Sequence, residues 1–156
     1  MTMLDDVAPL LGAGALLGLD PGTKTIGVAV SDGLQMTATA LETIKRRKFA
    51  QDAARLEEIA KGRGIVGVVV GLPLNMDGSE GPRAQSARAF ARNVSDKLDL
   101  PVALWDERLS TAAAERTLLE ADTSRKRRAE VIDAMAAQHI LQGVLDRLAV
   151  LARGSA

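Results

Sequence analysis

Residues 14–32, with the sequence GALLGLDPGTKTIGVAVSD, predict two β-strands joined by a sharp turn. An apolar run at residues 16–19 is followed by a Pro-Gly turn, and residues 26–30 form a second run of small and β-branched side chains. Asp20 therefore stands where the first strand ends. Because open α/β sheets bind ligands at strand ends, we interpret Asp20 as the first residue of an active site.

The composition limits what such a site can contain. The chain has 156 residues, of which 47% are hydrophobic and 26% charged, which is typical of one globular domain. It has no cysteine and one histidine, so a bound metal would need oxygen ligands, as Mg²⁺ or Mn²⁺ does. Because 20 basic residues balance 20 acidic ones, any attraction to nucleic acid must come from local basic clusters.

The two ends of the chain show weaker patterns of secondary structure than its middle. We expect a flexible tail at residues 1–12, a single domain at residues 13–152 and a short tail at residues 153–156. The uncharged run 7–19 is shorter than the roughly 20 apolar residues of a membrane span, and acids rather than Lys or Arg precede it. These features predict a cytoplasmic protein that does not contact a membrane.

The remaining chain alternates strand and helix patterns, which predicts an α/β fold. Residues 37–44 follow as a third strand, and the aliphatic run 65–70 is typical of a strand buried on both faces. Residues 102–105 complete a mixed five-stranded sheet flanked by helices. Helices are expected at residues 49–61, 83–98, 110–121 and 129–151.

Further acids are expected near Asp20. Asp106 and Glu107 follow the strand at residues 102–105, and since side chains alternate across a strand, only one of them should face the site. We favour Glu107 and keep Asp106 in reserve. Asp133 lies beside alanines on the last helix, and small side chains let a helix pack close to a sheet. Its carboxylate should therefore approach the strand ends.

Three convergent carboxylates repel one another unless a divalent cation neutralises them. Hydrolysis of phosphodiesters uses such cations, because one ion lowers the pKa of the attacking water while a second, roughly 4 Å away, stabilises the leaving oxygen. Each acid alone has a plainer interpretation: Asp20 as a turn residue and Asp133 as a solvated helix residue. Only their combination with Glu107 favours catalysis.

Four ordered motifs cover nearly the whole chain: LDPGTK with IGVAVSD (residues 19–24 and 26–32), GLPLNMDG (71–78), DERLST (106–111), and ID, MAA and ILQG (132–133, 135–137 and 140–143). Together they resemble the YqgF family, also called RuvX, of Holliday junction resolvases and pre-ribosomal RNA nucleases. The resemblance implies a ribonuclease H-like fold with five strands in the order 3-2-1-4-5. It also implies Mg²⁺ or Mn²⁺ as cofactor and Asp20, Glu107 and Asp133 as the catalytic, metal-binding triad.

The same resemblance implies a nuclease that matures the 5′ end of pre-16S rRNA, with the small ribosomal subunit as a partner, or that resolves branched DNA. It leaves open a monomer or a homodimer. The family usually has Arg where this chain has Thr25, so substrate affinity must come from other basic residues if that Arg contacts substrate. The candidates are Lys24, Arg83, Arg108 and two basic clusters, one at residues 45–48 and one of Arg125, Lys126, Arg127 and Arg128.

Two readings from other functional classes stay open. The turn after Asp20 also resembles the phosphate-binding hairpin of actin, sugar kinase and chaperone ATPases, although those proteins close two such domains over a nucleotide and this chain has the length of one. The other alternative is a non-catalytic RNA-binding or ribosome-assembly factor. Tight ATP binding would favour the first, and turnover of nucleic acid would exclude the second.

Overall fold

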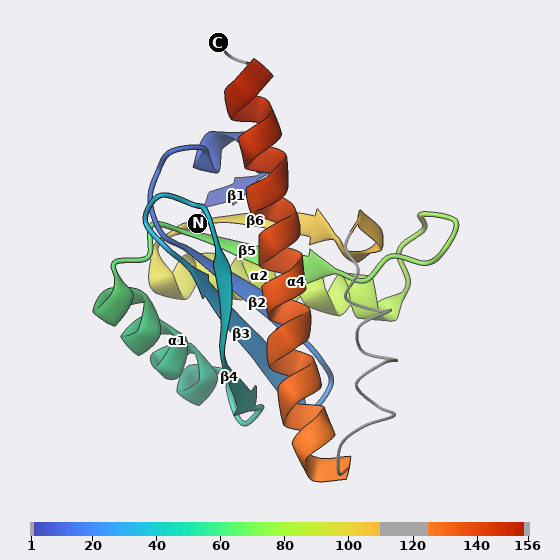
Figure 1. Ribbon diagram of the computed structural model, residues 1–156. Helices are drawn as coiled ribbons and strands as arrows, with labels where there is room; N and C mark the ends of the chain where they lie inside the picture. Colours follow the sequence, from blue (N-terminus) through green and yellow to red (C-terminus); the bar gives the residue numbers. More distant parts are fainter. Residues whose placement is uncertain (1, 110–124, 155–156) are drawn as a thin grey trace.

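A mixed six-stranded sheet, with the strand order β1-β6-β5-β2-β3-β4, forms the centre of the molecule (Figure 1). The computed structural model describes residues 2–109 and 125–154, with the backbone alone for residues 125–132. The strands are β1 (Thr2–Leu4), β2 (Leu16–Pro21), β3 (Thr25–Ser31), β4 (Ala38–Lys45), β5 (Gly67–Leu72) and β6 (Pro101–Asp106).

The predicted hairpin lies in the middle of this sheet. β2 and β3 pair antiparallel with Asp20 opposite Gly27, and the amide of Gly22 donates a hydrogen bond of 2.8 Å to the carbonyl of Thr25 across the turn. β5 runs parallel to β2 on its other side, and β6 runs parallel to β5. The five predicted strands and their order 3-2-1-4-5 are thus confirmed, and the carboxyl ends of β2, β5 and β6 lie at one edge.

The amino-terminal segment corrects the sequence-based expectation, because residues 2–12 are not a loose tail. β1 adds a sixth strand, pairing parallel with β6 so that Thr2 lies opposite Pro101. The 3₁₀ turn η1 (Ala8–Leu10) follows, and the side chains of Val7 and Leu10 are buried in the apolar cluster beneath the last helix. Burial of these two side chains holds the segment on the sheet.

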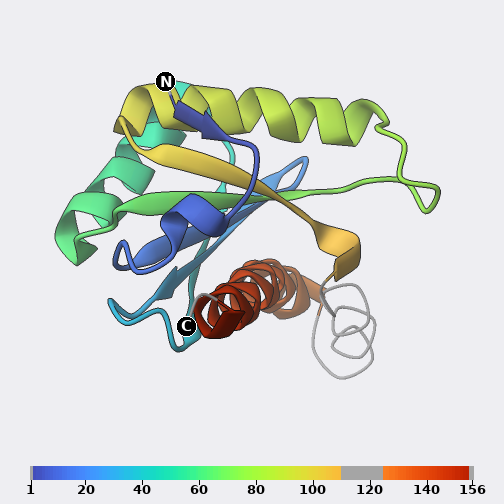
Figure 2. The same ribbon diagram turned by 90° about the horizontal axis from the view of Figure 1, so that it is seen from above.

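Helices cover both faces of the sheet (Figure 2). α1 (Phe49–Arg63) and α2 (Pro82–Leu98) pack on one face, whereas α4 (Arg125–Gly154) lies across the other. α1 ends at Gly64 with a left-handed φ of 64°, and Pro82 begins α2, as their sequences predict. None of the helices in the described residues combines the length and apolar character that a membrane span requires.

The last helix differs from its prediction at both ends. α4 begins at Arg125 rather than at residue 129, so the basic cluster forms its first turn. It continues through Gly154, which lies inside the expected tail at residues 153–156. The helix predicted for residues 110–121 lies outside the described part of the chain.

Two apolar clusters lie on opposite faces of the sheet. Leu17 and Leu19 belong to the cluster under α1 and α2, whereas Leu16 belongs to the cluster under α4. Because side chains alternate along a strand, Gly18 and Asp20 also face α4. The fold therefore places the Asp20 carboxylate between the sheet and its longest helix.

Glycines let α4 approach the strands at backbone distance. A Cβ atom built on Gly27 would lie 1.9 Å from the carbonyl oxygen of Asp133, and one on Gly18 would lie 2.8 Å from Cβ of Leu141. The buried alanines Ala136 and Ala137 contribute small side chains from the helix. The close packing inferred from alanines thus depends equally on glycines in β2 and β3.

Replacing Gly27 with Ala should destabilise the protein strongly, because the new methyl group meets helix backbone that cannot rotate away. We expect Gly27→Ala to lower the free energy of unfolding by about 3 kcal/mol or more, measured by urea denaturation. The matched control is Gly62→Ala in α1, where the new Cβ would have no atom within 4 Å apart from its chain neighbours and the backbone of its own helix. We expect Gly62→Ala to raise the free energy of unfolding by up to about 1 kcal/mol. Equal effects of both substitutions would contradict this account of the α4 packing.

Candidate active site

Asp20 occupies a gap in the side chains that cover the α4 face of the sheet. Its register partner on β3 is Gly27, and the parallel register that sets Leu19 opposite Val70 places Gly71 of β5 on its other side. Asp20 is buried, with 9% of the residue exposed. With glycine on both neighbouring strands, the space around this carboxylate is free for groups from elsewhere in the chain.

Asp133 enters this gap from α4 on the side of β3. Its backbone lies against Gly27, and its half-buried carboxylate accepts a hydrogen bond through Oδ2 from the hydroxyl Oγ1 of Thr25. Thr25 and Gly27 are two residues apart on β3 and share the face toward α4. The residue that replaces the expected Arg therefore contacts an acid of the candidate triad and orients it.

Glu107 enters the gap from the other side. It is the half-buried first residue of the 3₁₀ turn η2 (Glu107–Leu109), which directly follows β6. A Cβ atom on Gly71 would lie 2.7 Å from Oε1 of Glu107 and 2.6 Å from Cδ1 of Ile140 in α4. The Glu107 side chain thus lies over β5, so the three acids come from three separate elements and flank the end of β2.

Asp106, the reserve candidate, is engaged in a different contact. Its carboxylate accepts hydrogen bonds from Nη2 of Arg108 at 2.8 Å and from the Arg108 backbone amide at 2.9 Å. The side-chain hydrogen bond from Arg108 holds the pKa of Asp106 below its usual range. The position of the Glu107 side chain over Gly71 favours Glu107 over Asp106 as the acid that faces the site.

Arg108 is less available to a substrate than its sequence position indicates. Besides its ion pair with Asp106, its Nη1 group donates a hydrogen bond of 3.2 Å to the carbonyl of Met76. That contact links η2 to the loop at residues 73–81, which is closed by a hydrogen bond of 2.9 Å from the Asn75 amide to the Ser79 carbonyl. Arg108 therefore joins two loops at the strand ends.

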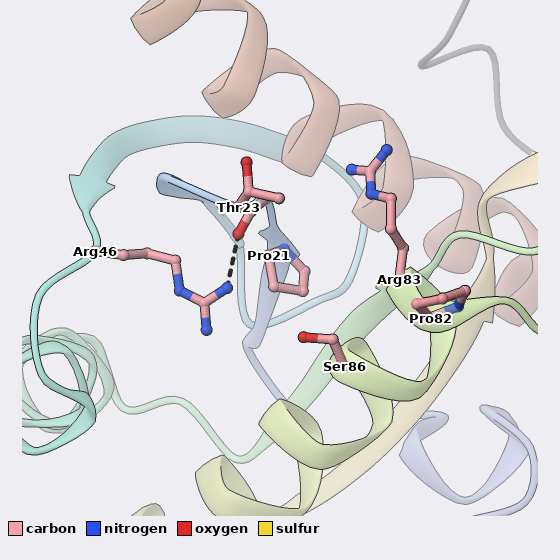
Figure 3. A pocket seen from close by; sticks show the side chains of 7 residues that line it. Pro21, Thr23, Arg46, Pro82, Arg83 and Ser86 are labelled. Carbon is pink, nitrogen blue, oxygen red and sulfur yellow. Dashed lines mark hydrogen bonds between the residues drawn. The ribbon is translucent and has the colours of Figure 1, made fainter.

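The other predicted substrate-binding residues are placed as follows. Lys24 is exposed in the β2–β3 turn, and Arg83 is exposed in the first turn of α2. The side chains of Arg125, Lys126, Arg127 and Arg128 lie outside the described part of the structure. Arg46, from the basic cluster at residues 45–48, lines a pocket with Arg83 beside the turn of the hairpin (Figure 3).

The carboxylate oxygens of Asp20, Glu107 and Asp133 are the kind of ligand that a hard divalent cation prefers. Gly27 and Gly71 keep the space between them open. Within the described residues, however, no group of three or more Asp, Glu, His or Cys side chains is close enough to hold a metal ion. Like charges repel when no cation lies between them. The three acids thus converge on one strand end without forming a closed set of ligands.

Comparison with solved structures supports the fold. The structure described as "T. thermophilus RuvC in complex with Holliday junction substrate" is similar with a TM-score of 0.55, covering 87% of this chain and 96% of that one. The sequences are 15% identical, so the likeness concerns the fold. It confirms the predicted ribonuclease H-like architecture.

Sequence comparison identifies much nearer relatives. A protein of Cereibacter sphaeroides (strain ATCC 17025 / ATH 2.4.3) named "Putative pre-16S rRNA nuclease" is 70% identical over 147 residues, covering 94% of this chain and 92% of the relative. A protein of the same name from Roseobacter denitrificans is 63% identical over 155 residues, covering 96% and 95%. The family model described as "RuvX: Holliday junction resolvase" matches residues 14–147. The chain therefore belongs to the RuvX family.

Proposed function

We propose that the protein is a nuclease that hydrolyses phosphodiester bonds in nucleic acid with the help of Mg²⁺ or Mn²⁺. The observation that carries this proposal is the approach of Asp20, Asp133 and Glu107 to one glycine-flanked strand end. Membership of the RuvX family and the names of its relatives support the same activity.

Each acid has a distinct role in this proposal. Asp20 is the central ligand, because it is buried on a strand with a paired strand on either side. Asp133, oriented by Thr25, and Glu107, lying over Gly71, complete the set from opposite sides. When bound, the ion supplies Lewis-acid activation of the attacking water and of the phosphate oxygens. Water is then the nucleophile, so no serine or histidine is needed for attack.

Substrate is held mainly through charge. The one tryptophan, Trp105, is buried against Gly143 of α4 and offers no surface for base stacking. Lys24, Arg83 and the basic cluster of Arg125 to Arg128 are the groups that we assign to phosphates, with a smaller part for the paired Arg108. Affinity should consequently fall with increasing salt.

We propose pre-16S rRNA as the substrate, with maturation of its 5′ end as the role in ribosome biogenesis, near the small subunit in the cytoplasm. The names of relatives that are 63% to 70% identical over nearly the whole chain support this choice. The second candidate is branched DNA, favoured by the family description and by the fold shared with a junction-bound RuvC. Symmetric cutting of a junction would require two active sites and thus a homodimer.

Parallel cleavage assays separate these functions. The purified protein is incubated with a labelled RNA that spans the 5′ end of 16S rRNA, or with a four-way DNA junction, in Mg²⁺, Mn²⁺ or EDTA. We expect cleavage of the RNA with either ion and none in EDTA. Binding without cleavage of either substrate would instead favour a non-catalytic assembly factor.

Substitution of the three acids tests the assigned site. Asp20→Asn, Glu107→Gln and Asp133→Asn should each lower kcat by about 10²-fold or more, since even outer-shell partners of metal ligands contribute 10- to 100-fold. The matched control is Asp106→Asn, which removes an adjacent acid that is paired with Arg108. It should stay within about tenfold of the parent. Loss of activity in Asp106→Asn together with full activity in Glu107→Gln would reverse the assignment of these two residues.

The hydroxyl of Thr25 should matter for metal binding, because it orients Asp133. Thr25→Val keeps the shape of the side chain but removes the donor, and we expect the dissociation constant of Mn²⁺, measured by electron paramagnetic resonance, to rise about tenfold. The free energy of unfolding should fall by about 1 kcal/mol. Thr25→Ser restores a hydroxyl and should bind Mn²⁺ like the parent. Equal Mn²⁺ affinity in all three proteins would show that Thr25 does not position the ligand.

A further inference from the structure

A small pocket beside the β2–β3 turn brings together two arginines that have no acidic partner among the described residues (Figure 3). The turn residues Pro21 to Thr23 form one wall, Arg46 a second, and the start of α2, with Arg83 and Ser86, a third. In Figure 3 the two arginines stand on either side of the turn. The pocket has a volume of about 160 Å³.

Arg46 is held in place by the protein itself. It directly follows β4, and its backbone amide donates a hydrogen bond of 2.9 Å to the carbonyl of Lys24. Its Nη1 group donates a hydrogen bond of 2.7 Å to the carbonyl of Gly22, and its Cζ atom lies 5.3 Å from the centre of the Phe90 ring. The position of the guanidinium is therefore fixed. Within the described residues its other N–H groups have no acceptor and can donate hydrogen bonds to a ligand.

Arg83 adds a second positive charge that no described carboxylate neutralises. By contrast, Arg88 on the same helix pairs with Glu80 at 2.5 Å, and Arg55 on α1 pairs with Glu42 and Glu58. The first turn of α2 contains no acidic residue, and its N-cap, Gly81, offers no side-chain hydrogen bond. The positive end of the helix dipole therefore adds to the charge of the arginines.

We propose that this pocket binds one non-scissile backbone phosphate of the substrate. Its volume lies below the roughly 300 Å³ at which pockets for whole small molecules begin, which suits a phosphate group rather than a nucleotide. Two guanidiniums and the Ser86 hydroxyl are donors that match phosphate oxygens. The chemistry is that of a phosphodiester, whether it comes from RNA or from branched DNA.

The position of the pocket links it to the acids. Pro21 and Gly22 directly follow Asp20, so the pocket and the carboxylates share the end of β2. Asp20 faces α4, whereas the pocket lies on the side of α2 and Phe90. A nucleic acid strand that crosses this end can place one phosphate in the pocket and a neighbouring one at the acids. The inference rests on the proposed function in that it takes the bound strand to be the substrate.

Binding without turnover tests the pocket separately from catalysis. In an Asp20→Asn background with EDTA, the dissociation constant of a fluorescein-labelled RNA spanning the 5′ end of 16S rRNA is measured from 50 to 200 mM salt. Arg46→Gln and Arg83→Gln should each weaken binding about fivefold to tenfold and reduce the slope of log K against log salt by about 1. The same series with a four-way DNA junction identifies which nucleic acid supplies the phosphate.

The control is Arg92→Gln, because Arg92 is exposed on α2 and lies nine residues, or 2.5 turns, beyond Arg83 and thus on the opposite side of the helix. It should change binding by less than about twofold. Thermal unfolding of each variant tests its fold. If Arg46→Gln is destabilised by the loss of its contact with Phe90, the exposed Arg83→Gln decides the outcome.

Strands that carry a single neutral methylphosphonate locate the phosphate. At one position in the strand, the methylphosphonate should weaken binding to the Asp20→Asn protein. The same methylphosphonate should not change binding to the Asp20→Asn protein that also carries Arg46→Gln and Arg83→Gln. The pocket assignment would be overturned if the arginine variants bound the strand as tightly as the Asp20→Asn protein. It would also be overturned if methylphosphonates at the same positions weakened binding to the Asp20→Asn protein and to its double-arginine variant. If the wild-type protein cleaves neither substrate but the methylphosphonate effect still depends on the two arginines, the nuclease proposal is wrong and the phosphate site is supported.

Discussion

The backbone contact between α4 and Gly27 determines where the acids of this protein can meet. No side chain fits between Gly27 and the carbonyl of Asp133, so the helix lies directly on the hairpin. The residue opposite Gly27 in the sheet is Asp20. A contact that is needed for packing thus also sets the separation between two carboxylates from distant parts of the sequence. Gly71 has the same function on the other side, where it leaves room for Glu107.

The charged side chains at this edge of the sheet form two sets. Asp106 and Arg108 neutralise each other and join η2 to the neighbouring loop. Asp20, Asp133 and Glu107 lie around the end of β2, and Asp133 accepts a hydrogen bond from the hydroxyl of Thr25. An arrangement that concentrates negative charge in this way is stabilised by a divalent ion. Basic residues line a pocket on the α2 side of the same edge, to which we assign a phosphate of the substrate.

Local sequence patterns were sufficient to predict the hairpin and the three strands that follow it, because apolar runs and turn residues mark each strand, whereas the strand order came from the family resemblance. They also placed Asp20 at a strand end. β1 was missed because a three-residue strand is too short to show a period, and its position depends on pairing with β6. Gly27 within a strand indicates a close approach without naming the partner. Arg46 reaches the pocket only because β4 returns antiparallel to β3, which a basic run alone does not reveal.

The central claim is that Asp20, Glu107 and Asp133 bind one divalent ion or a pair of ions at the end of β2. Crystals of the wild-type protein grown with saturating Mn²⁺ test it directly, because anomalous scattering locates manganese independently of the protein atoms. We expect an anomalous peak from a manganese ion bound by Asp20 and at least one of the other two carboxylates, with metal–oxygen distances of about 2.2 Å. Anomalous peaks only at other sites, or none at saturating Mn²⁺, would contradict it.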